Sequence, residues 1–367
     1  MNYFDIYTSD CAGSSGNQFV FYPEDENEIL TSRCFFKITV GGEYNYSFLF
    51  TNTIDSTFGD GSICRCNVIP PEWHIKSLAV SKCSSCSVEE MPQDKDLEEG
   101  FVQLTFNSEK EKTVFPAEIF STDPIKLNLE SGEFLCFEMK FCGKMLPYHE
   151  ETLLPVFRNE NGKWVPNVKM PLPCMIGCNR EVKKKITFIG DSITQGCGTP
   201  KNKYLHYSAF VADILGSDYA FWNIGLGYGR GYDAATNGAW LNKAKQSDIV
   251  TVCFGVNDIL QGYSADEIKN SLSTIIEKLK EKGITVIIQT IPPFDYDEKN
   301  AETWTKVNKY INEVLSKKAD GLFDNVEFLS VGGNTPQMSL YGPHPDEHGH
   351  KIWGDRLSEY LKNFLND

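Results

Sequence analysis

The sequence has no hydrophobic run long enough to cross a membrane as a helix. No window reaches the roughly 18 apolar residues that such a helix needs. The N-terminal residues also lack the basic segment and following apolar stretch of a secretory signal. These absences predict a soluble, cytoplasmic protein.

Positive charge is also scarce. The sequence contains 35 lysines and arginines against 50 aspartates and glutamates, a formal net charge of -15 that no basic run offsets. Such a surface repels nucleic-acid phosphates and anionic lipid headgroups. The charge therefore argues against nucleic acid and against an anionic membrane as partners, and it favours a neutral or weakly charged small molecule as substrate.

Cysteine, by contrast, is plentiful, with 12 residues. In an oxidising compartment these residues could pair as disulfides. Cys136, Cys142 and Cys253 lie within apolar, strand-like runs, however, where a free cysteine behaves as a small hydrophobic residue. Together with the missing signal, this placement predicts reduced thiols.

Four of the cysteines invite comparison with a structural zinc site. Cys64-x-Cys66 is followed by Cys83-x-x-Cys86, and four thiolates can hold zinc in a tetrahedron. The first pair has the wrong spacing for a zinc knuckle, and no nearby histidine completes a known pattern. We therefore predict no metal site here.

Length and composition predict two globular domains. Single cores rarely grow to 367 residues, and 41% hydrophobic with 23% charged residues is an ordinary globular composition. Residues 1–180 predict an antiparallel, jelly-roll-like β-sandwich as an accessory domain, because short β-rich runs alternate there with turns. The runs are 19–22, 34–40, 46–50, 101–106 and 134–139. The span 147–185, which contains several prolines, is predicted to connect the domains.

Residues 181–367 alternate between strand-like and helical patterns. The expected strands are 186–189, 219–224, 248–254, 284–289 and 326–329. The expected helices are 207–215, 264–282, 301–318 and 347–364. This alternation predicts an α/β domain with a parallel sheet between two helical layers. Ligands of such sheets bind at the carboxyl ends of the strands.

A serine follows the first of these strands. The motif Gly190-Asp191-Ser192-Ile193-Thr194 places the Ser192 hydroxyl at the functional edge of the sheet, where a nucleophile is expected. The same residue types also cap helices, so this motif alone does not identify a catalytic serine. Asp191 is interpreted as a brace for the turn.

Three further motifs follow in order and supply what a nucleophilic serine needs. A glycine-rich loop begins at Asn223, Asn257 follows the third strand, and His344 precedes the last helix. His344 can act as general base. The oxyanion can be held by the Ser192 backbone N–H, a backbone N–H of the loop, and the Asn257 side-chain amide.

These four blocks resemble the SGNH (GDSL-like) hydrolase family, named after its serine, glycine, asparagine and histidine. The resemblance covers residue 185 to the end and implies a flavodoxin-like α/β/α catalytic domain, 181–367, with no cofactor. It carries over Ser192 as nucleophile, Asn257 as oxyanion donor and His344 as base.

The second block departs from the family pattern. The family's oxyanion glycine commonly lies five residues after the asparagine, and that position here is Tyr228. Because the donor is a backbone N–H, the side chain does not forbid the role. We favour Gly227, with Tyr228 and Gly229 as alternatives.

The last block departs further. The aspartate that usually lies three residues before the histidine is replaced by Tyr341. A backbone carbonyl, Asp346 or Glu347 can orient the imidazole instead, and we favour a Ser-His dyad with backbone assistance. The opposite interpretation, an inactive protein, is weaker because nucleophile and oxyanion donors remain.

The remaining polar residues near these motifs receive structural interpretations. His344, His348 and His350 lack the glutamate-bearing signature of a zinc hydrolase, so no metal is predicted there either. Asp258, beside the oxyanion asparagine, is interpreted as structural.

A β-sandwich ahead of an SGNH domain with a dyad is similar to carbohydrate esterase family 2. This resemblance implies deacetylation of plant polysaccharides or their oligosaccharides. Separately, Tyr228, Tyr232 and Tyr341 lie in loops near the predicted site, as sugar contacts or as simple packing residues. The alternatives are a lipase, lysophospholipase or thioesterase, or a non-catalytic phosphate- or sugar-binding protein. The sequence leaves homo-oligomer formation open.

Overall fold

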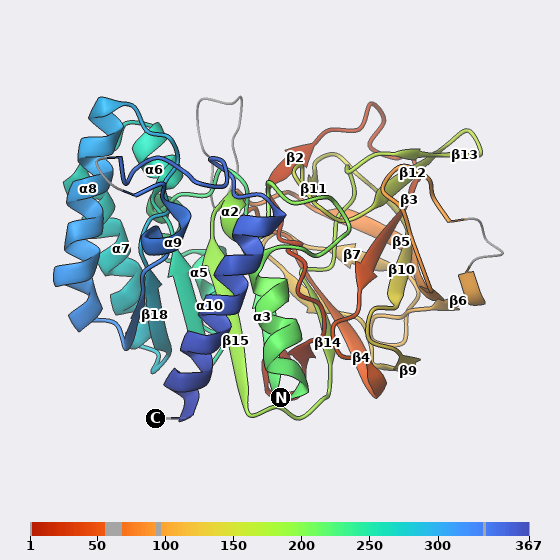
Figure 1. Cartoon of the computed structure of the whole chain (residues 1–367). Helices are drawn as coiled ribbons and strands as arrows, with labels where there is room; N and C mark the ends of the chain where they lie inside the picture. Colours follow the sequence, from red (N-terminus) through yellow and green to blue (C-terminus); the bar gives the residue numbers. More distant parts are fainter. Residues whose placement is uncertain (1, 56–67, 93–96, 333–334, 367) are drawn as a thin grey trace. The chain divides into compact units, whose positions relative to one another are not determined.

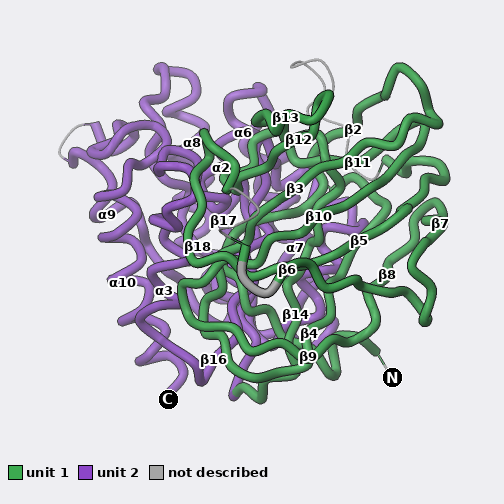
Figure 2. The backbone as a smooth tube through the Cα atoms, turned by 90° about the vertical axis from the view of Figure 1, so that its right-hand side faces the viewer, with its two compact units in different colours: residues 1–182 green, residues 183–367 purple. Residues whose placement is uncertain are grey.

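A computed structural model describes residues 2–55, 68–92, 97–332 and 335–366 of the chain. The chain divides into two compact units, residues 1–182 and residues 183–367, which Figure 2 colours separately. The division lies two residues beyond the expected position, 182 against 180.

The first unit is built from antiparallel strands, as the sequence predicts. One sheet has the order β1 (Thr8–Ser9), β14 (Met175–Cys178), β4 (Gly42–Thr51) and β8 (Ile119–Ser121), with β9 (Ile125–Leu129) also paired to β4. The other has the order β13 (Lys163–Pro166), β12 (Val156–Glu160), β3 (Leu30–Lys37), β10 (Phe134–Gly143), β5 (Trp73–Cys83) and β6 (Leu97–Gln103), with β7 (Lys112–Val114) on β5. The strands β2 (Phe19–Phe21) and β11 (Leu146–Tyr148) form a separate pair, and a short helix α1 (Tyr3–Ile6) precedes them all.

Aromatic side chains join the two large sheets of this unit. Phe137 of β10 is fully buried and packs edge-on against Phe48 of β4, with ring centroids 4.7 Å apart at 89°. Phe36 of β3 also packs against the Phe137 ring, with ring centroids 5.6 Å apart. The core of the first unit therefore depends on rings that face each other from different sheets.

The prediction that residues 147–185 form a connection is wrong. The strands β12, β13 and β14 lie within this span, and β12 pairs with β3 while β14 pairs with β4. The turn at Asn161 and Gly162 is the tip of the β12–β13 hairpin, and both residues have positive φ, 53° and 83°. This turn chemistry is typical of a tight hairpin, so the turn signal was correct but belonged to the sheet.

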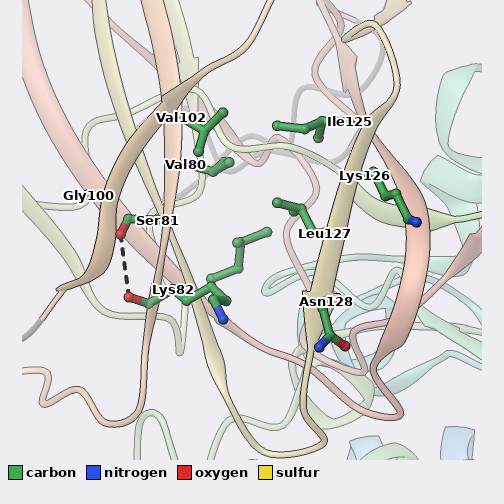
Figure 3. Close-up of a pocket in the computed structure, with 10 residues that line it drawn as sticks. Val80, Ser81, Lys82, Gly100, Val102, Ile125, Lys126, Leu127 and Asn128 are labelled. Carbon is green, nitrogen blue, oxygen red and sulfur yellow. Dashed lines mark hydrogen bonds between the residues drawn. The ribbon is translucent and has the colours of Figure 1, made fainter.

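A cavity of about 290 Å³ opens in the first unit between strands of the two sheets (Figure 3). Its aliphatic walls come from Val80 and Val102 on one side and from Ile125 and Leu127 on the other, with Lys82 and Asn128 toward one end. Aliphatic walls favour an apolar group, and none of the lining residues offers an aromatic face to a sugar ring.

The second unit is a mixed α/β domain with a five-stranded parallel sheet. The strand order is β16 (Tyr219–Asn223), β15 (Lys184–Gly190), β17 (Ile249–Cys253), β18 (Thr285–Gln289) and β19 (Gly321–Phe323). The chain first adds β16 on one side of β15 and then adds β17 on the other. This reversal makes the carboxyl ends of β15 and β17 the place where such sheets bind ligands.

The helices of the second unit form packed pairs. Figure 1 shows α3 (Tyr207–Leu215) beside α10 (Glu347–Asn366), and the Tyr207 ring stacks on Trp353 at 4.4 Å. The helices α7 (Ala265–Lys280) and α8 (Glu298–Glu313) also contact each other. The shorter helices are α2 (Ser192–Gln195), α4 (Gly231–Ala235), α5 (Ala239–Ala244), α6 (Val256–Leu260) and α9 (Val326–Leu329). Within the residues that the structure describes, no helix has the length and apolarity that crossing a membrane requires.

The strand expected at 326–329 is wrong, because these residues form the helix α9. The strand lies earlier, at Gly321–Phe323, and Asp324 then accepts a hydrogen bond from the Val326 N–H at 3.0 Å. A four-residue apolar run does not by itself distinguish a strand from a buried helical turn. Here the carboxylate before the run favours the helix.

Replacing Phe137 with alanine should destabilise the first unit by about 3–5 kcal/mol, because the change leaves a cavity between the sheets. Phe115, which is 54% exposed, provides the matched control, and Phe115→Ala should cost less than about 1 kcal/mol. Urea unfolding of the full chain measures both values. Equal midpoints for the two variants would contradict the interpretation.

Candidate active site

The nucleophile candidate lies in the turn between β15 and α2. Gly190 ends the strand, and a Cβ there would collide with the Thr194 side chain, so the tight turn needs glycine. The Asp191 carboxylate accepts a hydrogen bond from the Ile193 N–H at 3.0 Å. Ser192 is the first residue of α2, so its own N–H has no partner within the helix.

Ser192 and His344 meet across 152 positions of sequence. The Ser192 Oγ lies 2.8 Å from His344 Nε2, a hydrogen-bonding distance. Ser192 is buried and His344 half-buried. The Phe294 ring packs edge-on against the imidazole, with centroids 5.3 Å apart at 76°. The pair has the separation that a base needs to take a proton from a hydroxyl.

No acidic residue orients the imidazole in the described part of the chain. Asp346 accepts hydrogen bonds at 3.0 Å from two backbone N–H groups in the first turn of α10 and so caps that helix. Tyr341, at the family's aspartate position, contributes its backbone carbonyl to the Asp346 N–H, and Glu347 makes no bond to His344. Among the described residues, Ser192 is the hydrogen-bond partner of His344, and Nδ1 has none.

Burial sets the ionisation of His344. It lowers the pKa of the imidazole below its usual value of about 6.5, since no neighbouring anion counteracts the desolvation. The ring is therefore neutral at neutral pH. A neutral imidazole is the form that accepts a proton.

Asn257 is the predicted side-chain donor to an oxyanion. It lies in the first turn of α6, directly after β17, and its Nδ2 donates a hydrogen bond to the Gly229 carbonyl at 2.9 Å. An amide nitrogen carries two hydrogens, and within the described ranges no hydrogen bond uses the second. This hydrogen is available to a substrate oxygen.

The glycine-rich loop contains the three residues considered as the second donor. The Gly227 N–H donates to Gln195 Oε1 at 2.6 Å, and the Gly229 N–H donates to the Leu226 carbonyl at 3.0 Å. Tyr228 has φ of 59°, a left-handed conformation that glycine adopts most readily. Gly227 would have to exchange Gln195 for substrate in order to act, so its role stays a prediction.

Two buried aspartates beside the site bind backbone amides. Asp258 accepts hydrogen bonds from the Gly231 and Tyr232 N–H groups at 2.9 and 3.0 Å. Burial raises the pKa of Asp258 to about 6 and that of Asp191 to about 7. Both contacts hold loops in place, in line with the structural interpretation of these residues.

The three tyrosines named as substrate contacts occupy different surroundings. Tyr228 and Tyr232 are 40% and 48% exposed and come from the glycine-rich loop and α4. Tyr341 is half-buried and packs closely over Gly349 in the first turn of α10. Exposed aromatic faces are therefore present on the side of the oxyanion donors.

The possible metal ligands are scattered. The His348 side chain is 75% exposed, whereas His350 is fully buried and accepts a hydrogen bond from the Tyr207 N–H. Cys64 and Cys66 lie outside the described residues. Elsewhere in the described chain, no three or more His, Cys, Asp or Glu residues are grouped so that they could hold a metal.

Sequence analysis missed Phe294 and the buried Arg230. Phe294 follows β18, so the rule that pointed to the loops after β15 and β17 also applies to it. An apolar ring carries no chemical signature, however. Arg230 lies directly after the glycine-rich loop and is only 6% exposed, which its sequence context did not indicate.

The second unit is similar to known proteins of one family. Residues 188–352 match the GDSL-like lipase/acylhydrolase family, which confirms the family resemblance. No curated protein matches the sequence. Similar solved structures include a putative lipolytic protein of the G-D-S-L family from Desulfitobacterium hafniense (19% identity, TM-score 0.41, 48% of this chain and 98% of that chain). Others are the acetyl xylan esterase AlAXEase (22%, 0.38, 48% and 99%) and an aryl esterase of M. smegmatis (17%, 0.41, 49% and 99%).

The lowered pKa of His344 predicts the pH dependence of ester hydrolysis. With His344 as the predicted base, the neutral ring is the reactive form, so kcat/KM should rise with pH through one ionisation below 6.5 and then stay level through neutral pH. A pH–rate profile with a small aryl acetate measures this. A wild-type inflection above 6.5 would refute the assignment.

Tyr341 provides the comparison variant. A carboxylate that reaches Nδ1 stabilises the imidazolium, so Tyr341→Asp should move the inflection to higher pH, while Tyr341→Phe should leave it in place. Comparing the two pH–rate profiles distinguishes the effect of a new negative charge from the effect of losing the tyrosine hydroxyl.

Proposed function

Because residues 188–352 match the GDSL-like lipase/acylhydrolase family, we propose that the protein is a serine esterase with Ser192 as nucleophile and His344 as general base. The observation that carries this proposal is the 2.8 Å separation between Ser192 Oγ and His344 Nε2. A nucleophile and a base at hydrogen-bonding distance, beside amide donors, suit acyl transfer.

The reaction proceeds in two half-reactions. The Ser192 Oγ attacks the ester carbonyl while His344 Nε2 takes the hydroxyl proton, and the oxyanion binds the Ser192 N–H, the Asn257 Nδ2 and a loop N–H. The tetrahedral intermediate collapses as His344 protonates the leaving alcohol. His344 then deprotonates a water molecule that attacks the acyl-serine, and the second tetrahedral intermediate collapses to the free acid as His344 returns the proton to Ser192 Oγ. No step requires a cofactor.

The proposal includes a three-layer, flavodoxin-like arrangement of the catalytic domain, residues 181–367. It is supported by the strand order, in which β15 lies between β16 and β17, and by the contacting pairs α3–α10 and α7–α8. It also includes a jelly-roll-like accessory domain at residues 1–180, supported by two antiparallel sheets that contact through Phe48 and Phe137.

For the substrate, we propose a short-chain acyl group, acetyl above all, carried by a carbohydrate. Tyr228 and Tyr232 support this proposal, because exposed tyrosine rings beside the oxyanion donors can stack on a sugar. The negative formal charge of the chain also suits a neutral substrate better than an anionic one.

A lipase, lysophospholipase or thioesterase is the second candidate, and a different set of side chains favours it. Val331, Met338 and Leu340 precede His344 in sequence and are 49%, 42% and 51% exposed. Exposed aliphatic residues close to the base in sequence suit a longer acyl chain.

Ser192→Ala should lower hydrolysis of a small aryl acetate by at least about 1,000-fold, because the covalent step is lost. Ser316, a half-buried serine in the short 3-10 helix Leu315–Lys317 that follows α8, provides the matched control, and its hydroxyl donates to the Asn312 carbonyl. Ser316→Ala should retain full activity. Wild-type turnover by the Ser192→Ala protein would refute Ser192 as the nucleophile. A wild-type protein that neither hydrolyses the ester nor reacts with an organophosphonate would instead favour a binding protein.

Acetate release from acetylated oligosaccharides should exceed turnover of long-chain acyl esters, since the tyrosines favour a sugar. Comparing kcat/KM for both substrates measures the preference. Tyr232→Ala should raise the KM for the oligosaccharide, whereas the KM for the aryl acetate should change little. A higher kcat/KM for the long-chain ester would select the second candidate.

A further inference from the structure

Arg230 carries a buried charge that the proposed mechanism does not use. It follows the glycine-rich loop directly and is only 6% exposed. Residues 183–367 contain one other arginine, Arg356, whose side chain is 49% exposed on α10. A buried guanidinium is costly unless its donors are bonded, so the arrangement around Arg230 calls for a physical reason.

Each of the three guanidinium nitrogens of Arg230 donates at least one hydrogen bond. Its Nε and Nη2 bind the two carboxylate oxygens of Asp233 at 3.0 and 2.7 Å, and the Asp233 side chain is fully buried. Its Nη1 donates to Gln261 Oε1 at 2.9 Å and to the Tyr263 hydroxyl at 2.7 Å. The rings of Tyr232 and Tyr263 lie 5.3 Å from the guanidinium carbon.

These bonds connect the two segments that hold the oxyanion donors. Arg230 and Asp233 continue from the glycine-rich loop, whereas Gln261 is the C-cap of α6, the helix that begins beside Asn257. One side of Arg230 therefore holds the loop through Asp233. The other side binds Gln261, at the C-terminal end of α6, the helix that contains Asn257.

Two further contacts join the same segments. Asn257 Nδ2 donates to the Gly229 carbonyl at 2.9 Å, one residue before Arg230. Asp258 accepts the Gly231 and Tyr232 N–H groups, one and two residues after it. Hydrogen bonds thus connect the glycine-rich loop and the residues after it to both ends of α6, and Arg230 supplies the charged one of these contacts.

We propose that Arg230 is a positioning residue of the oxyanion hole, which fixes the distance between the glycine-rich loop and Asn257. This inference rests on the proposed esterase function. Oxyanion donors act only when they are held at hydrogen-bonding distance from the developing charge, so a small displacement of either segment lowers the rate of the chemical step.

The role requires arginine rather than lysine. The planar guanidinium binds both oxygens of Asp233 and still directs Nη1 at two acceptors on the other segment. A lysine ammonium keeps the charge but cannot form this fork, and it stacks less well on the two tyrosine rings. Arg230→Lys therefore preserves the charge and removes the connection.

In the full-length protein, Arg230→Lys should lower kcat for a small aryl acetate by about 10- to 100-fold and change KM by less than about threefold, because ground-state binding does not depend on the oxyanion donors. Arg356→Lys is the matched control and should retain wild-type kcat. The rate of inactivation by an organophosphonate, which also forms a tetrahedral adduct, should fall in parallel with kcat.

Two further variants distinguish positioning from folding. Tyr263→Phe keeps the ring and removes one acceptor of Nη1, so it should show a smaller fall in kcat at an unchanged thermal midpoint. In the Asn257→Ala background, Arg230→Lys should cost markedly less than in the wild type, because one of the donors that Arg230 positions is already missing.

The inference is overturned if Arg230→Lys retains the wild-type kcat. It is also overturned if Arg230→Lys lowers kcat by the same factor in the Asn257→Ala background as in the wild type. A fall in the thermal midpoint of Tyr263→Phe that matches its fall in kcat would likewise overturn it. An inactive wild-type protein that also resists the organophosphonate would instead count against the esterase function itself. Wild-type activity with an insensitive Arg230 would leave that function standing and remove the positioning role alone.

Discussion

The parallel alignment of β15 and β17 is the constraint on which the candidate site depends. Because both strands run in the same direction and are neighbours, their carboxyl ends open onto one place, and Ser192 and Asn257 follow these ends directly. The histidine reaches the same place from the start of α10, where Asp346 caps the helix behind it. The geometry of three residues far apart in sequence thus follows from one strand pairing and one helix terminus.

Buried acidic groups around this site bind backbone amides rather than substrate. Asp191 and Asp258 each accept N–H groups at the start of a short helix or loop, and Asp233 neutralises Arg230. Backbone N–H groups in an irregular segment lack the main-chain acceptors of a helix or sheet, and these carboxylates accept their hydrogen bonds instead. The loops at the sheet edge can be irregular and still hold their shape, which is what preorganised donors require.

The sequence alone predicted the chemistry-bearing residues of the candidate site but not the residues that support them. Ser192, Asn257 and His344 were identifiable because each follows a strand or precedes a helix within a compact motif. The contacts of Arg230 with Gln261 and Tyr263 span about 30 positions and have no local pattern. The predictions of a strand at 326–329 and of a connection at 147–185 were wrong for a related reason. A short apolar run or a turn has the same sequence pattern whether or not the segment pairs with a β-sheet.

The unpartnered Nδ1 of His344 has a consequence for the neutral ring itself. Imidazole carries its single hydrogen on either nitrogen, and only the tautomer with the hydrogen on Nδ1 leaves Nε2 free to accept from Ser192. A carboxylate would hold the hydrogen at Nδ1, but no described residue does so. At any moment a fraction of the molecules therefore carries the hydrogen on the wrong nitrogen. A substrate whose own oxygen reaches Nδ1 would increase the reactive fraction by binding, and would so assist its own hydrolysis.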